Sequence, residues 1–250
     1  MRVADLPDAP PRRIVLVNPP VVVVDRVQLD YYADAVPYGL HQVAAWLSSC
    51  GHEALLADMM GYGKHRHDWP GLLARGELTP LPERLPSGAE ELELDAWLYG
   101  KPLEWLESWL DDLGGREPDE VWLTCSMLFN AHLTHDLVGL LRRRLPRAVI
   151  RLGGDWATLT PDHAARSGAD DVFLGRIPEA DLAVPDLAPG GSPVDFALFR
   201  LTTGCPNRCA FCVNRIHPLQ ELPLGPIVDA IEEARGKGVR SFNNWDPNIL

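Results

Sequence analysis

The sequence lacks long apolar runs and is poor in positive charge. Its purest apolar run, residues 21–24, is far too short to cross a bilayer, and the N-terminus lacks the apolar core of a signal peptide. The 23 Lys and Arg residues are outnumbered by 35 Asp and Glu residues, which gives a net charge of −12. Since nucleic-acid binding depends on clustered cations, we expect a cytoplasmic protein with neither a membrane nor a nucleic acid as partner.

Cysteine is also scarce, and its placement is uneven. Only five are present in 250 residues, and three of them, Cys205, Cys209 and Cys212, follow the spacing CxxxCxxC. The other two, Cys50 and Cys125, lie in apolar patterns typical of small buried side chains. A structural zinc site normally takes four protein ligands, so three thiolates on one short loop favour an iron–sulfur cluster with one iron left open. Zinc is the alternative.

Apolar periodicity predicts an α/β first domain over residues 12–182. Buried strands are expected at residues 13–18, 52–58, 120–126, 148–152 and 171–174, with helices at 38–50, 133–145 and 161–167. This alternation is typical of a doubly wound, Rossmann-like parallel sheet. Residues 1–11 are expected to form an unstructured tail.

An insert over residues 61–118 interrupts the alternation. Within it, Leu103, Leu106, Leu110 and Leu113 keep the spacing of one amphipathic helix behind Pro102. Trp97, Trp105 and Trp109 could form an aromatic cofactor box, but their large apolar area favours packing. His65 and His67 are too few to make a metal site, and His41, His132, His135 and His163 fall on predicted helices as surface or core residues.

A Pro- and Gly-rich linker is expected at residues 183–197, followed by an incomplete second domain at 198–250. That domain should contain a strand near residues 198–202, the cysteine loop, a helix from Pro226 and a strand at 239–245. Ligands of doubly wound sheets bind at the carboxyl ends of the strands. The turns at residues 18–20, 126–128, 153–155 and 175–176 are therefore the candidate ligand contacts.

The stretch 201–214 resembles the signature of radical S-adenosylmethionine (radical SAM) enzymes, including the aromatic Phe211 before the last cysteine. The resemblance implies a four-iron four-sulfur (4Fe-4S) cluster held by Cys205, Cys209 and Cys212, with S-adenosylmethionine on the open iron. It places the backbone around Phe211 near the adenine, and Asp246 near the amino group of S-adenosylmethionine. Asp246 could equally be part of a turn only.

The turns of the first domain resemble the cobalamin-binding domain of cobalamin-dependent radical SAM enzymes. The implied cobalamin contacts are Asn18, Pro19, Ser126, Met127, Leu128, Gly153, Gly154 and Asp155. Glycine at 153 and 154 would let a nucleotide tail approach the backbone closely. The motif Asp-x-His-x-x-Gly is absent from the sequence, so we expect cobalt without a protein histidine below it.

Together these resemblances imply methyl transfer to an unactivated carbon of a small-molecule substrate, through a 5′-deoxyadenosyl radical and methylcobalamin. They also imply an electron donor of the flavodoxin or ferredoxin type. The second domain holds only the first βα units of a TIM-like barrel, so a longer chain or a partner subunit should supply the rest. The alternatives are a cobalamin-dependent rearrangement or cyclisation without methylation, and a non-catalytic cobalamin- or metal-binding subunit.

Overall fold

The structure is a computed structural model that describes most of the chain. The described residues are 3–23, 37–60, 71, 74, 76, 78–80, 96–126, 130–188, 196–207, 209, 210, 212 and 217–246. Five residues discussed above, Met127, Leu128, Phe211, His65 and His67, lie outside them.

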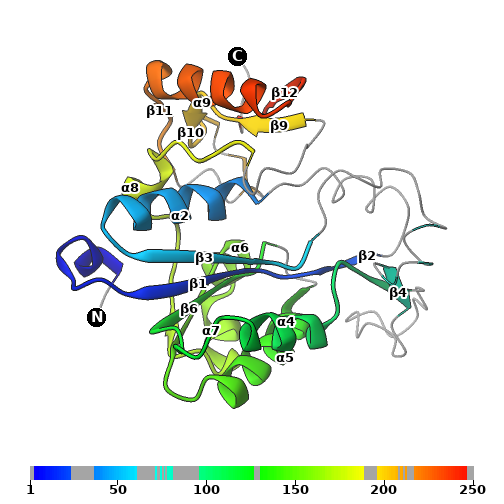
Figure 1. The fold of residues 1–250 in the computed structure, drawn as a ribbon. Coiled ribbons are helices and arrows are strands. Elements are labelled where there is room, and N and C mark those ends of the chain that lie inside the picture. Colours follow the sequence, from blue (N-terminus) through cyan, green and yellow to red (C-terminus); the bar gives the residue numbers. More distant parts are fainter. Residues whose placement is uncertain are drawn as a thin grey trace.

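A five-stranded parallel sheet forms the centre of the molecule (Figure 1). Its strands are β1 (Arg13–Asn18), β3 (Glu53–Asp58), β6 (Glu120–Thr124), β7 (Val149–Gly153) and β8 (Asp171–Val172), in the spatial order β3-β1-β6-β7-β8. All four neighbouring pairs are parallel. The predicted α/β fold with a parallel sheet is confirmed.

Helices cover both faces of this sheet because β1 is apolar on both sides. Its side chains alternate, with Ile14 and Leu16 in one core cluster and Val15 and Val17 in another. The first face is covered by α2 (Tyr38–Ser49) and α8 (Pro178–Asp181), and the second by α4 (Leu103–Asp111), α5 (Ala131–Arg144), α6 (Asp155–Leu159) and α7 (Pro161–Ala164) (Figure 1). None of the helices in the described part of the chain is both long and apolar enough to cross a bilayer.

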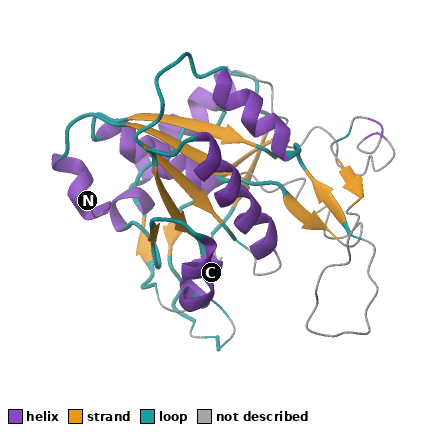
Figure 2. Ribbon diagram, turned by 90° about the horizontal axis from the view of Figure 1, so that it is seen from below, coloured by secondary structure: helices purple, strands orange, loops and turns teal. Residues whose placement is uncertain are grey.

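Two parts of the first domain differ from the sequence prediction. The expected unstructured tail is wrong, because residues Val3–Asp8 form the 3-10 helix η1. Leu6 is fully buried there, and its carbonyl oxygen lies 3.0 Å from Nε2 of His52. Second, β2 (Val21–Val23), β4 (Leu78–Pro80) and β5 (Trp97–Tyr99) form a small antiparallel sheet beyond one end of the main sheet (Figure 2).

Residues 196–246 form a second unit, which we call the cysteine unit. Its strands β9 (Phe196–Phe199) and β12 (Ser241–Asn244) pair in parallel and are joined through α9 (Leu224–Gly236). The short antiparallel strands β10 (Thr202–Thr203) and β11 (Gln220–Glu221) flank the cysteine loop. One βαβ unit fits the start of a barrel, although a partial barrel stays a prediction. The cysteine unit lies on the α2 side of the main sheet (Figure 1).

A charged network is buried at the start of β6. The side chain of Glu120 is fully buried and accepts hydrogen bonds from Arg12 Nη1 at 2.9 Å, Trp122 Nε1 at 2.9 Å and Arg151 Nε at 2.7 Å. Burial alone would lower the pKa of Arg151, but Glu120 and Asp171 outweigh burial and raise it. Glu120 therefore holds the guanidinium of Arg151 in its charged form next to the sheet.

We predict that Glu120→Gln lowers the free energy of unfolding by about 3 kcal/mol, because it removes the main counter-charge of a buried arginine. Urea denaturation monitored by circular dichroism measures this. Glu117→Gln is the control: Glu117 pairs with Arg147 at 3.0 Å, but their side chains are 39% and 81% exposed. Glu117→Gln should lower the free energy of unfolding by less than about 1 kcal/mol. Equal losses in the two variants would contradict the assigned role of Glu120.

Candidate functional site

A cavity of about 680 Å³ opens at the carboxyl edge of the parallel sheet. Four strands deliver residues to it: Asn18 ends β1, Ser126 follows β6, Gly153 ends β7, and Gly175 follows β8. The chain reverses its order in the sheet between β1 and β6, and open parallel sheets bind ligands at such a reversal. The strand order therefore places polar strand ends around one hollow.

The cysteine unit and α2 supply the other wall of the cavity. Tyr38 comes from the first turn of α2, while Arg200, Trp245 and Asp246 come from the cysteine unit. Five predicted cobalamin contacts, Asn18, Ser126, Gly153, Gly154 and Asp155, thus line the same cavity as the predicted S-adenosylmethionine contact Asp246. Pro19 is not among the described residues that line it.

The two glycines after β7 have different roles. Gly154 has φ +95°, and a Cβ there would lie 2.6 Å from the carbonyl oxygen of Cys125 and 2.7 Å from Oγ1 of Thr124. Glycine is thus needed at 154 because the end of β6 packs against it, a reason that the sequence interpretation did not include. A Cβ on Gly153 would meet nothing nearer than 3.9 Å, so space for a ligand exists at Gly153.

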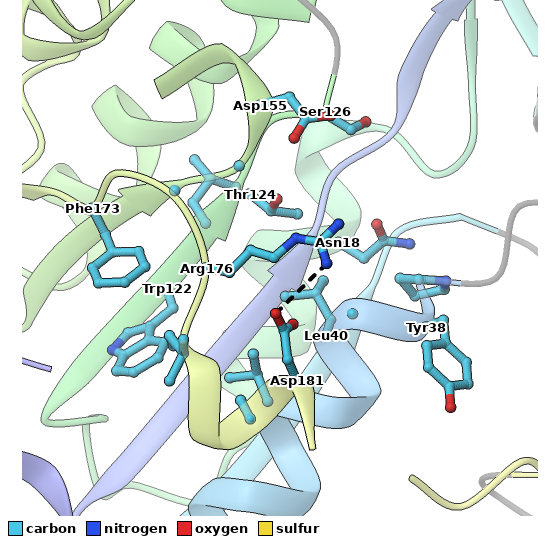
Figure 3. Close-up of a pocket in the computed structure, with 18 of the residues that line it drawn as sticks. Asn18, Tyr38, Leu40, Trp122, Thr124, Ser126, Asp155, Phe173, Arg176 and Asp181 are labelled. Carbon is cyan, nitrogen blue, oxygen red and sulfur yellow. Dashed lines mark ion pairs between the residues drawn. The ribbon is translucent and has the colours of Figure 1, made fainter. Parts of the chain in front are cut away.

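Polar side chains gather at the strand ends in the close-up of the cavity. Figure 3 shows Asp155 and Ser126 together at one end, with Asn18 between them and Tyr38. Asn18 donates from Nδ2 to Oδ1 of Asp58 at 2.8 Å, which fixes the orientation of its amide. Burial raises the pKa of Asp155, and the nearby charge of Arg176 opposes this rise. Asp155 thus retains its proton to a higher pH than an exposed aspartate.

Arg176 connects the sheet to the cysteine unit. Its Nη1 lies 3.6 Å from Oδ2 of Asp181 in α8, an ion pair drawn in Figure 3, and donates to Oγ1 of Thr203 at 2.7 Å. Thr203 belongs to β10 and comes two residues before Cys205. The end of β8 is therefore tied to the strand that leads into the cysteine loop.

The cysteine loop is closed at its base. Gly204 has φ +73°, and a Cβ there would lie 2.0 Å from the carbonyl oxygen of Pro218. The backbone N–H of Cys205 donates to the carbonyl of His217 at 3.3 Å, and that of Cys212 to Cys209 at 3.1 Å. Cys205 and Cys212 are half-buried, and Cys209 is exposed.

Three thiols on one loop suit an iron–sulfur cluster by their donor chemistry. Within the described residues, however, no group of three or more His, Cys, Asp or Glu side chains is placed to hold a metal ion. The three described cysteines are therefore not arranged as a metal-ligand set in this structure, and their ligand role stays a prediction.

Asp246 has a structural role in the cysteine unit. Its Oδ1 accepts hydrogen bonds from the backbone N–H groups of Leu201 at 2.9 Å and Thr202 at 3.0 Å. It thereby fixes the chain just before the cysteine loop. Its position in the cavity wall keeps it next to the space where a ligand would lie.

Sequence reasoning missed several residues of the cavity. Asp181 and Arg200 lie in segments that carry no binding motif. The sequence predicted Arg176 only as part of the turn at residues 175–176. Its position directly after Gly175 was the signal that pointed to a role in the cavity. Packing between the two units, which no local pattern encodes, brings these residues together.

We predict that Gly154→Ala lowers the free energy of unfolding by about 3 kcal/mol, since the new Cβ meets backbone atoms and the positive φ disfavours alanine. Gly153→Ala is the matched control and should change stability by no more than about 1 kcal/mol. Guanidinium denaturation of both variants measures the difference. If Gly154→Ala is as stable as Gly153→Ala, the close approach to Cys125 is wrong.

We predict a pH-dependent effect of Asp155→Asn. Because the pKa of Asp155 is raised on folding, the folded chain binds this proton more tightly than the unfolded chain. Its contribution to stability is therefore lost as pH rises above about 4. Asp155→Asn removes this loss, so the variant should gain stability relative to the wild type as pH increases toward neutrality. Denaturation midpoints across the pH range test this, with exposed Asp162→Asn as control; a gain that shrinks with rising pH would contradict it.

Comparison with known proteins gives two partial similarities, and no family model matches the chain. The chain is 31% identical over 108 residues to the ribosomal protein uS12 methylthiotransferase RimO of Pelobacter propionicus, a match that covers 41% of this chain and 24% of the relative. The match thus spans about a quarter of that relative's length. Among solved structures, the chain is similar to a cobalamin-binding protein from Desulfitobacterium hafniense DCB-2, with a TM-score of 0.36, 13% identity, and coverage of 68% of this chain and 54% of the other.

Proposed function

We propose that this chain carries the cobalamin-binding domain and the first part of the radical SAM domain of a cobalamin-dependent radical SAM enzyme. The observation that carries the proposal is the shared cavity, in which strand-end residues of the parallel sheet face residues of the cysteine unit. The spacing of Cys205, Cys209 and Cys212 supports the radical SAM part. The partial similarity to a methylthiotransferase supports a group-transfer enzyme.

We propose a position for each cofactor from the residues present. Cobalamin would lie at the strand ends against Asn18, Ser126 and Gly153, where the cavity has open space. The 4Fe-4S cluster would be held by the three cysteines once their loop closes around it, and S-adenosylmethionine would contact Asp246. When bound, these groups supply the radical and methyl-transfer chemistry, while the chain's own residues bind them, orient them and exclude water.

The reaction we propose is methylation of an unactivated carbon of a small molecule. An electron donor of the flavodoxin or ferredoxin type would supply the reducing electron, and a longer chain or a partner subunit would complete the barrel around the substrate. Product mass measured with isotopically labelled S-adenosylmethionine separates methylation from a rearrangement or cyclisation, because only methylation adds the labelled methyl group to the product.

We predict that anaerobic reconstitution loads about four irons and four sulfides per chain. Replacing Cys205, Cys209 and Cys212 together by alanine should abolish both, because the thiolates are the only cluster ligands proposed. Cys50→Ala, at a half-buried cysteine packed beside the apolar core, is the matched control and should load normally. Iron and sulfide analysis with visible absorbance measures the outcome.

Two results would overturn the proposal. Zinc bound without sulfide would leave a metal-binding module rather than a radical SAM enzyme. A chain that loads the cluster but gives no shift in the absorbance of hydroxocobalamin would lack the cobalamin part. Because these measurements are independent, each half of the proposal is tested by itself.

A further inference from the structure

Arg200 is a cation in the cavity wall that forms no ion pair within the described part of the chain. It follows β9 and lines the cavity, and its Nε is buried with no hydrogen-bond partner among the described residues. Its nearest recorded ring is that of Tyr38, whose centroid lies 5.2 Å from the guanidinium carbon. Tyr38 is itself buried. Its ring packs near the guanidinium and makes a cation–π contact, but it carries no negative charge that would pair with Arg200.

The carboxylates near Arg200 are engaged elsewhere. Asp181 lies 3.6 Å from Arg176 and 3.5 Å from the hydroxyl of Thr203. The Oδ1 atom of Asp246 accepts two backbone N–H groups. Burial lowers the pKa of Arg200, and the like charge of Arg176 lowers it further, against weaker opposing effects of Tyr38, Asp181 and Asp246. Arg200 is therefore a half-buried cation whose charge these carboxylates offset only in part.

We infer that Arg200 is the recognition residue for an anionic group, a phosphate or a carboxylate, of the ligand that occupies the cavity, with Arg176 as a second cation beside it. A buried cation is costly unless an anion accompanies it, and a planar guanidinium fork matches the paired oxygens of these two groups. The unpaired Nε and the neighbouring cation both favour an incoming negative charge.

The identity of the anion rests on the proposed function, whereas the anion site does not. Cobalamin carries a phosphodiester in its nucleotide tail, and S-adenosylmethionine carries a carboxylate. Each has an analogue without the part that bears that group: cobinamide lacks the nucleotide tail with its phosphodiester, and 5′-methylthioadenosine lacks the amino-acid part with its carboxylate. Comparing each cofactor with its analogue therefore identifies which anion Arg200 contacts.

The experiment compares the wild type with Arg200→Met, Arg200→Lys and the control Arg235→Met. Arg235 is exposed on α9 and bonded to Glu232, so it tests the loss of a surface arginine in the same unit. Inorganic phosphate should stabilise the wild type and Arg235→Met in thermal unfolding. Its affinity should fall about tenfold in Arg200→Met and less in Arg200→Lys, which keeps the charge but loses the fork.

Ligand-free stability separates recognition from a structural role. Arg200→Met keeps a similar length and removes a cation whose buried Nε has no hydrogen-bond partner among the described residues, so without phosphate it should unfold at the same or a higher temperature than the wild type. A lower unfolding temperature would show that the arginine stabilises the fold and would overturn the inference. Wild-type protein that gains no stability from phosphate, or Arg200→Met that binds phosphate as tightly as the wild type, would overturn it too.

Binding of each cofactor and of its analogue is measured by equilibrium dialysis with the same variants. If the phosphodiester is the anion, Arg200→Met should weaken binding of hydroxocobalamin about tenfold and leave cobinamide unchanged. If the carboxylate is the anion, the same contrast should appear between S-adenosylmethionine and 5′-methylthioadenosine. Equal effects on a cofactor and its analogue would exclude that cofactor's anion. Phosphate binding through Arg200 in a chain that binds neither cofactor would support the anion site and contradict the proposed function.

Discussion

The position of β1 between β3 and β6 is the constraint on which the rest of this structure depends. The chain leaves β1 toward β3 across one face of the sheet through α2, and returns past β1 to β6 across the other face, where α4 packs. Right-handed crossovers in opposite directions leave the carboxyl ends of β1 and β6 uncovered between them. The cavity lies at these strand ends and is lined there by Asn18, Ser126 and Gly153.

The same constraint explains the uneven distribution of charge. Where the sheet is packed on both faces, its charges are paired within it, as Glu120 is with Arg12 and Arg151. At the open edge, burial instead shifts the pKa of Asp155 upward and that of Arg200 downward, because the opposite charges near them (Arg176 for Asp155, and Asp181 and Asp246 for Arg200) offset burial only in part. Perturbed pKa values cluster at ligand sites, so these charged groups favour this edge of the sheet as the proposed ligand site.

Much of this fold follows from local patterns. The strands β1, β3, β6 and β7 and the helices α2, α4, α5 and α9 could be predicted because apolar spacing reports burial directly. The helix η1 and the antiparallel strands β2, β4 and β5 could not, because they depend on distant partners such as His52 for Leu6. The cavity was foreseeable at the strand ends but not on its second wall. Gly154 shows where local patterns are insufficient. The Gly-Gly turn predicted that a ligand approaches the backbone at Gly154, but the atoms that require glycine there belong to Cys125 and Thr124.

The cysteine loop owes its position to contacts outside its motif. Asp246 holds the backbone of Leu201 and Thr202, and Arg176 holds the hydroxyl of Thr203, so the strand entering the loop is fixed from both units. Gly204 then lets the backbone pass against Pro218 and closes the base of the loop. The backbone N–H of Cys205 also donates to the carbonyl of His217, so the base of the loop is held together. A metal centre formed on Cys205, Cys209 and Cys212 would therefore bind to a loop whose base is already fixed, which costs less conformational entropy than closing a free chain.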